Sequence, residues 1–222
     1  MTTRGARPHP DDGPQDATPD LPAESGIGVG PHPQPWPDDP RLDPDLLAGG
    51  DRRNVLDRYR YWQLDAIVAD LDTRRHEFSV AIENWHHDRN IGTVVRTANA
   101  FLAREVVIVG RRRWNRRGAM VTDRYQHLVH VGTVEELRAH AGDVPIVGVD
   151  NLPGSVPIET FALPRKVILL FGQESIGLTD EARAACAAVC SIAQYGSTRS
   201  INAGVAAGIA MHAWIRAHAA LP

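Results

Sequence analysis

The sequence has only two cysteines, a single lysine and no long apolar run, and these scarcities exclude several classes of protein. Cys186 and Cys190 stand four residues apart in an alanine-rich stretch, so they make no zinc-ligand set and are read as buried packing residues in a reducing compartment. No apolar run approaches the roughly 18 residues that a membrane-spanning helix needs, and the first residues lack the apolar core of a signal peptide. We therefore expect a soluble, cytoplasmic protein that does not bind membranes.

Large apolar residues are also scarce in the first 50 residues, which hold 11 of the 16 prolines and 7 of the 19 glycines. That segment carries nine acidic residues against three arginines, whereas residues 51–222 carry 18 acidic and 21 basic residues. A segment of this composition buries too little apolar surface to offset the entropy lost on ordering. The sequence thus predicts a disordered acidic tail at 1–50, a helical extension at 51–75 and one compact domain at 76–222.

Helical and strand patterns alternate beyond the tail. The pattern predicts helices over 54–75, 90–103, 133–140, 179–189 and 200–218. It predicts strands over 77–84, 104–110, 144–150 and 166–172, and a short one ending at 192. The continuous apolar run at 166–172 is typical of a strand buried on both faces. This order favours an α/β fold with a mainly parallel sheet and helices on both faces.

Three polar, glycine-containing segments follow predicted strands, at 83–101, 169–181 and 191–202. Ligands of open parallel sheets bind at the carboxyl ends of the strands, so these segments are the candidate site. The glycines of the second segment have the spacing of a phosphate-binding loop, but Leu178 stands where that loop requires lysine, which excludes it. The sequence GIGVG at 26–30 follows no strand, so a dinucleotide-binding loop is not supported either.

Taken together, the three segments resemble the signature motifs of the SpoU (TrmH-like) 2′-O-ribose RNA methyltransferases of the SPOUT superfamily. The resemblance covers about residues 80–222 and rests on N-x-G-x-x-x-R from Asn90 to Arg96, on F-G-x-E at 171–174 and on S-I-N at 200–202. It implies an α/β domain with a C-terminal trefoil knot and S-adenosyl-L-methionine as the methyl donor. It also implies a homodimer that acts on tRNA or rRNA.

The resemblance assigns roles to individual residues. Those matching cofactor-binding positions are Leu170, Gly172, Ile192, Gln194 and Ile201. Those matching catalytic positions are Arg96, Asn90, Glu174, Ser200 and Asn202. Arg96 matches an arginine proposed to help deprotonate the ribose hydroxyl, but arginine stays protonated, so stabilising the developing alkoxide or holding a phosphate is the easier role. A structural ion pair of Arg96 with Glu174, and helix capping by Asn90 or Ser200, remain alternatives.

No metal is expected, because methyl transfer from a sulfonium to oxygen depends mainly on positioning. His86 and His87 stand next to Asp88, but adjacent residues rarely ligate one ion together and no further ligand set is evident, so they do not indicate a metal site.

Residues 111–117, here called the arginine segment, contain five arginines and one tryptophan. The candidate RNA-binding residues are Arg111, Arg112, Arg113, Trp114, Arg116, Arg117 and, in the third motif, Arg199. Arginines at this density suit a phosphate backbone, and Trp114 can stack on an unpaired base. A solvated surface loop is the alternative. No separate RNA-binding domain is recognisable, and the helix predicted at 54–75 is a candidate to replace it.

The last predicted helix begins with small residues, Ala203, Gly204, Ala206, Ala207 and Gly208. A glycine inside a helix costs about 1 kcal/mol relative to alanine, so this composition predicts that another part of the protein comes close. The resemblance points to the knot and the dimer interface, with Trp214 as an interface candidate, whereas a tightly packed core helix is the other explanation. The family usually has Val and Ser at the positions of Ala203 and Gly204.

Two other functions remain open at this stage, methylation of an RNA base atom and RNA binding without catalysis. The S-I-N form of the third motif favours ribose. The joint presence of Arg96, Glu174 and Asn202 argues against a silent protein.

Overall fold

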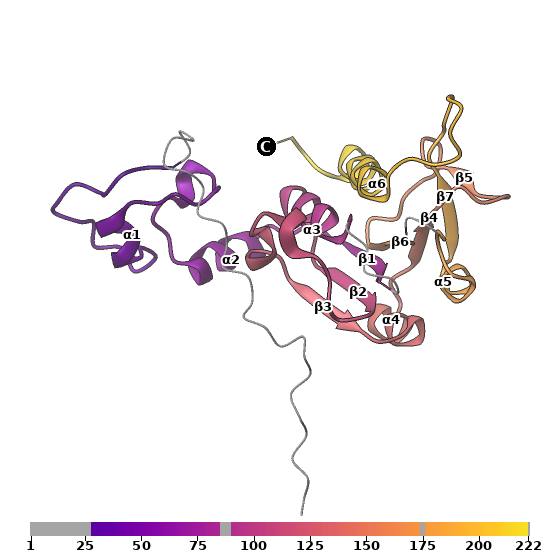
Figure 1. Cartoon of the computed structure of the whole chain (residues 1–222), viewed down its shortest axis with the longest axis horizontal. Coiled ribbons are helices and arrows are strands. Elements are labelled where there is room, and N and C mark those ends of the chain that lie inside the picture. Colours follow the sequence, from indigo (N-terminus) through magenta and orange to yellow (C-terminus); the bar gives the residue numbers. More distant parts are fainter. Residues whose placement is uncertain (1–27, 85–89, 174–175, 222) are drawn as a thin grey trace, which may run out of the picture.

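The computed structural model describes residues 28–84, 90–173 and 176–221. Seven strands form one sheet in the order β3-β2-β1-β6-β4-β7-β5, and every pair of neighbours is parallel (Figure 1). The strands are β1 (Phe78–Asn84), β2 (Val106–Gly110), β3 (Leu128–Val131), β4 (Ile146–Val149), β5 (Val156–Pro157), β6 (Val167–Phe171) and β7 (Ala188–Ser191). The predicted α/β fold with a parallel sheet is confirmed.

Helices cover both faces of the sheet, as predicted (Figure 1). One face carries α3 (Asn90–Ala100) and α6 (Ala203–His218), and the other carries α4 (Val134–Ala141) and α5 (Asp180–Ala185). Side chains alternate between the faces along a strand, so Val80 and Ile82 of β1 pack under α3 and α6 while Ala81 packs under α4 and α5. The central strands are therefore buried on both sides, which explains their continuous apolar runs.

The small residues of α6 lie against α3. A Cβ placed on Gly204 would be 3.1 Å from Cγ2 of Thr93, and one placed on Gly208 would be 3.8 Å from Cγ2 of Thr97. Helix against helix packing is therefore what requires small side chains on this face of α6.

Trp214, at the other end of α6, is not an interface residue of the kind predicted. Its side chain is 1% exposed within the single chain, its ring lies 4.7 Å from that of Phe78, and its Nε1 donates to the carbonyls of Pro164 and Arg165 at 3.1 Å each. Tryptophan is suited to this position because it fills a large core volume and still satisfies its N–H.

Residues 28–50 differ from the predicted disordered tail. They contain α1 (Pro44–Gly49), with Pro44 at the first helical position and Asp43 as its N-cap, and α1 lies well to one side of the sheet (Figure 1). Composition failed here because polar contacts, rather than a large apolar core, fix this region. Residues 1–27 of the predicted tail lie outside the described part of the chain.

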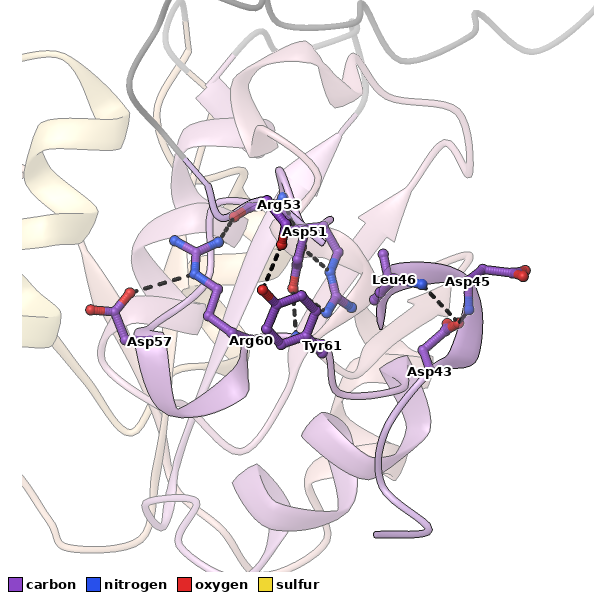
Figure 2. A network of polar contacts seen from close by, with 9 residues as sticks. Asp43, Asp45, Leu46, Asp51, Arg53, Asp57, Arg60 and Tyr61 are labelled. Carbon is purple, nitrogen blue, oxygen red and sulfur yellow. Dashed lines mark hydrogen bonds and ion pairs between the residues drawn. The ribbon is translucent and has the colours of Figure 1, made fainter. Parts of the chain in front are cut away.

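Asp51 is the centre of those polar contacts and is fully buried (Figure 2). Its carboxylate accepts hydrogen bonds from the backbone amide and the guanidinium of Arg53 and from the amide of Tyr61 at 2.9 Å. Burial alone would raise the pKa of this carboxyl, but the bonds from Arg53 and Tyr61 outweigh burial and lower it. The Asp51 backbone also pairs with Val29, so residues 28–30 are tied to the same point.

The single helix predicted over 54–75 is wrong. The chain forms a short 3-10 helix, η1 (Asp57–Tyr59), and then α2 (Leu64–Asp72), separated by Tyr61, whose φ of 63° interrupts any continuous helix. This extension packs on the domain through Tyr59 and Ile67, which form a small apolar cluster with Tyr125.

Two strands were not predicted. β3 has four residues and β5 only two, and β5 includes a proline, so neither carries a strong pattern. Two short 3-10 helices, η2 (Arg116–Ala119) and η3 (Thr122–Arg124), fill the connection between β2 and β3. Within the described residues, no helix is both long and apolar enough to span a membrane.

Candidate functional site

All seven strands point the same way, so the loops that leave their carboxyl ends meet at one edge of the sheet. β1 and β6 are neighbours at its centre, with Ile82 opposite Phe171, and β4 lies on the other side of β6. The first and second motifs therefore start side by side. The third motif follows β7, which pairs with β4.

The first and third motifs are in direct contact. Nδ2 of Asn202 donates to Oδ1 of Asn90 at 2.9 Å, across 112 positions of sequence. Oδ1 of Asn202 accepts from the amides of Gly204 and Val205, so Asn202 is the N-cap of α6 and the predicted helix start at residue 200 is too early. The side-chain oxygen of Asn202 thus caps α6, and its NH₂ group joins α6 to α3.

The second motif forms a tight loop. A Cβ on Gly172 would overlap the backbone of Gly177 and Leu178, so only glycine fits where the loop folds back on the end of β6. Gly177 has a φ of +74°, and Gln173 exchanges two backbone hydrogen bonds with it. The loop is fixed at its far end by Asp150, whose Oδ2 accepts from the amide of Leu178 at 2.9 Å.

Glu83 is a buried acid of this edge to which the sequence assigned no role. Its carboxylate, with a residue exposure of 0%, accepts from the amide of Thr179 at 2.9 Å and from its hydroxyl at 2.7 Å. Because Thr179 is also the N-cap of α5, Glu83 ties the end of β1 to the helix after the second motif. The sequence feature that could have identified Glu83 is an acidic residue at the end of an apolar strand.

The remaining predicted cofactor and catalytic residues have different environments. Leu170 is fully buried and its backbone pairs with both neighbouring strands, whereas Gly172 stands just beyond the strand end. Ile192 and Ile201 are half-buried, as is Gln194. Ser200 is exposed and does not cap α6. Glu174 and the pair His86 and His87 lie outside the described residues.

Arg96 is exposed on α3. It stands four residues after Gly92, so the spacing of the first motif puts the two on the same face of the helix. Within the described parts of the chain, its guanidinium has no ion-pair partner.

Gly118 and Ala119, which directly follow the arginine segment, lie against the first turns of α3. A Cβ on Gly92 would be 2.7 Å from the amide nitrogen of Ala119 and 2.8 Å from Cα of Gly118, so the two backbones touch. This contact explains the glycine of the first motif and places the arginine segment beside the face that carries Arg96. Trp114 is half-buried against the core, with the guanidinium of Arg116 5.6 Å from its ring centroid.

Three further features bear on ligands. Gln173 is 4% exposed, and both polar atoms of its side chain lack a hydrogen-bond partner in the part of the chain that the structure describes. Within the described residues, no three His, Cys, Asp or Glu side chains come together as metal ligands. Burial raises the pKa of Cys186 and of Cys190 to about 11, so both thiols stay protonated and unreactive at neutral pH.

These features define a parallel α/β domain with a polar site at the carboxyl edge of the sheet and a basic segment beside it. A model of the SpoU rRNA Methylase family matches residues 77–212, more than half of the chain, and the chain belongs to that family. The resemblance stated from the motifs is confirmed.

Curated relatives agree with this assignment. An uncharacterized tRNA/rRNA methyltransferase of Mycolicibacterium vanbaalenii is 29% identical over 185 residues, which cover 78% of this chain and 58% of the relative. One of Mycolicibacterium smegmatis is 31% identical over 140 residues, which cover 60% of this chain and 44% of the relative. The chain thus spans about half the length of these relatives.

Solved structures share the fold. The SpoU methyltransferase AviRb of Streptomyces viridochromogenes, solved with AdoMet, is 26% identical with a TM-score of 0.57, and the match covers 66% of this chain and 60% of AviRb. A TrmH/SpoU tRNA modifying enzyme of A. aeolicus is 21% identical with a TM-score of 0.61, covering 69% of this chain and 81% of that chain, and shows the fold alone.

Proposed function

We propose that this protein is an S-adenosyl-L-methionine-dependent methyltransferase that methylates a ribose 2′-hydroxyl of tRNA or rRNA. The observation that carries the proposal is the hydrogen bond between Asn90 and Asn202. It joins two motifs far apart in sequence at the helix that presents Arg96, beside the arginine segment. RNA methylation requires a cofactor site, a cation near the acceptor and a surface for phosphates, and we assign these roles to the carboxyl edge of the sheet, to Arg96 and to the arginine segment.

The residues at the carboxyl edge fit S-adenosyl-L-methionine. Gln173 offers a buried donor and a buried acceptor that the protein itself leaves unused, and such atoms are costly unless a ligand satisfies them. Backbone groups of Gly172, Ile192 and Ile201 would hold the cofactor, with Gln194 and Leu170 as the further candidates. When bound, the cofactor supplies a methyl group on a sulfonium, which an oxygen nucleophile displaces in line.

Arg96 would act on the acceptor. A guanidinium remains charged, so its role is to stabilise the 2′-oxygen as negative charge develops there and to hold the adjoining phosphate. Asn202 and Asn90 would position the ribose and the start of α6, and Ser200, being exposed, can donate to the RNA. Glu174 remains a candidate catalytic residue by its place in the second motif.

The arginine segment and Arg199 would bind the RNA backbone. Five arginines that each meet one phosphate of a single strand would give a salt slope, the slope of log affinity against log salt concentration, of about −3.5. Replacing all five with alanine should remove most of that slope. An unchanged slope in this variant would mean that the segment does not meet phosphate.

The C-terminal trefoil knot and a homodimer belong to the same proposal, since the family resemblance implies both. A dimer is supported by the apolar side chains that α6 leaves at the surface, Val205 at 53% and Ile209 at 38% exposed. Both stand on the helix that begins at Asn202, so a second copy there would border the site.

The proposal is tested by methyl transfer from labelled S-adenosyl-L-methionine to bulk tRNA and, separately, to ribosomal RNA. Transfer to one pool by the wild-type protein, and its loss in Arg96→Ala with cofactor affinity within a few-fold, would support the proposal. Full activity of Arg96→Ala would remove this residue from the mechanism. Absence of cofactor binding in the wild-type protein would leave a silent RNA-binding protein instead.

A further inference from the structure

Asn84 is the last residue of β1 and lies opposite Gly110, the last residue of β2. It is fully buried, and its Nδ2 donates to the carbonyl of Arg111 at 2.6 Å and to the carbonyl of Arg113 at 2.8 Å. The backbone carbonyl of Asn84 accepts a hydrogen bond from the amide of Arg111 at 2.9 Å. One buried side chain therefore fixes the backbone of two arginines as the chain leaves the sheet.

No other common side chain of this size can replace the amide. An NH₂ group has two N–H donors, and here each meets one of two carbonyls. An aspartate of the same shape would offer only acceptors to those carbonyls, and a serine would offer one donor. Among the described residues, the Oδ1 atom of Asn84 has no hydrogen-bond partner, whereas both donors of its NH₂ group are used.

The far end of the arginine segment is fixed as well. The amide of Arg117 donates to Oδ1 of Asn115 at 3.0 Å, and Gly118 packs on Gly92 of α3. The segment is thus held at both ends, by Asn84 at the sheet and by Gly118 at α3. A cationic loop that is held in one shape binds phosphates without losing the entropy of ordering.

We propose that Asn84 is a positioning residue for RNA binding. The RNA meets the arginines, and Asn84 acts through their backbone by setting where Arg111 and Arg113 stand relative to α3. This inference rests on the proposed function. It differs from that function in its consequence, because it concerns affinity for RNA and not cofactor binding or the methyl-transfer step.

The test compares Asn84→Asp with the wild-type protein, using bulk tRNA and purified ribosomal RNA as probes. If the arginines at 111 and 113 each lose a phosphate, the salt slope should become shallower by about 1.4, which is about a 25-fold loss of affinity at 0.1 M salt when the affinities are equal at 1 M. The cofactor dissociation constant, and kcat at saturating RNA, should stay within about twofold. Amides of residues 111–114 should exchange faster with solvent, while those of α4 should not.

Gln126→Ala is the matched control. Gln126 is also a buried amide, 6% exposed, and its Nε2 donates to the carbonyl of Ala103, but it lies away from the arginine segment. It should lower the melting temperature without changing the salt slope. If Asn84→Asp does not fold, Asn84→Ser, which keeps one donor, should give an intermediate slope.

The outcomes separate the two claims. A wild-type protein that binds neither RNA would refute the proposed function itself. A wild-type protein that binds RNA, with an Asn84 variant of equal affinity and salt slope, would refute the positioning role alone. An equal loss of RNA affinity in the Gln126 control would show that lost stability, and not position, explains the effect.

Discussion

Gly92→Ala tests the contact on which the site depends, the packing of residues 118 and 119, directly after the arginine segment, on α3. A Cβ at this position would lie 2.7 Å from the nitrogen of Ala119 and 2.8 and 2.9 Å from Cα and C of Gly118. All three are backbone atoms, so no side-chain rotation can relieve the overlap. Either α3 or the arginine segment has to move.

The size of the effect follows from two opposing contributions. Alanine in place of glycine inside a helix ordinarily stabilises by about 1 kcal/mol. Overpacking ordinarily costs about 1–3 kcal/mol, and contacts this short with immobile backbone place the cost at the upper end. The net result should be a loss of about 1–2 kcal/mol, which for a chain of this size lowers the melting temperature by about 2–8 °C.

Gly208→Ala is the control for this reasoning. Gly208 is also inside a helix, but the nearest atom to its added Cβ is Cγ2 of Thr97 at 3.8 Å, an ordinary contact. This variant should gain up to about 1 kcal/mol and melt about 2–4 °C higher. Calorimetry of the two variants beside the wild-type protein measures both. A Gly92 variant as stable as the wild-type protein, or shifts of the same sign in both variants, would refute the packing argument.

Three further predictions, two from substitutions and one from pH, test other parts of the structure. Asn202→Ala removes the N-cap of α6 and should lower the free energy of unfolding by about 1 kcal/mol. Asn202→Asp keeps the acceptor for the cap and should cost less. Equal melting temperatures of the two variants would contradict the capping role. Trp214→Phe leaves two buried carbonyls without their donor and should lower the free energy of unfolding by about 1–3 kcal/mol. The same change at a tryptophan that is exposed in the single chain, as an interface residue would be, should cost far less. The lowered pKa of Asp51 means that its stabilisation is present above its ordinary value of 3.8 and is lost as pH falls through the lower folded value. Protection factors of the amides in residues 28–63, which compare exchange with the intrinsic rate at the same pH, should therefore fall in acid, and protection factors that do not change with pH would contradict this.

The domain could be predicted from the sequence because its signals are local and agree with one another. The run from Val167 to Phe171 and the alternation of strands with helices suffice for a parallel sheet buried on both faces. The motif spacing also predicts the site, since Asn90 and Asn202 each stand at a helix start and Arg96 lies on the helix that Asn90 begins. What joins them, the side-chain bond between Asn90 and Asn202, is a contact over long sequence separation and leaves no local pattern.

The parts that sequence reasoning missed depend on such distant contacts. The polar composition of residues 28–50 does not predict an ordered structure, yet contacts with Asp51, whose carboxylate is buried, hold this region in place. From the sequence alone Trp214 looks like an interface residue, and only the fold shows that its side chain packs in the core beside Phe78. Asn84 and Glu83 stand in the first motif segment, but their partners come from the loops after β2 and β6, so their roles follow only from the fold.

The central claim, transfer to a ribose hydroxyl, is tested most directly by where the label stands in the RNA product. RNA methylated with labelled S-adenosyl-L-methionine is hydrolysed with alkali, which cleaves only beside a free 2′-hydroxyl. For a ribose methyltransferase the label should be recovered in alkali-resistant dinucleotides and should be absent from RNA treated with Arg96→Ala. Label recovered in mononucleotides would place the methyl group on a base and refute transfer to ribose.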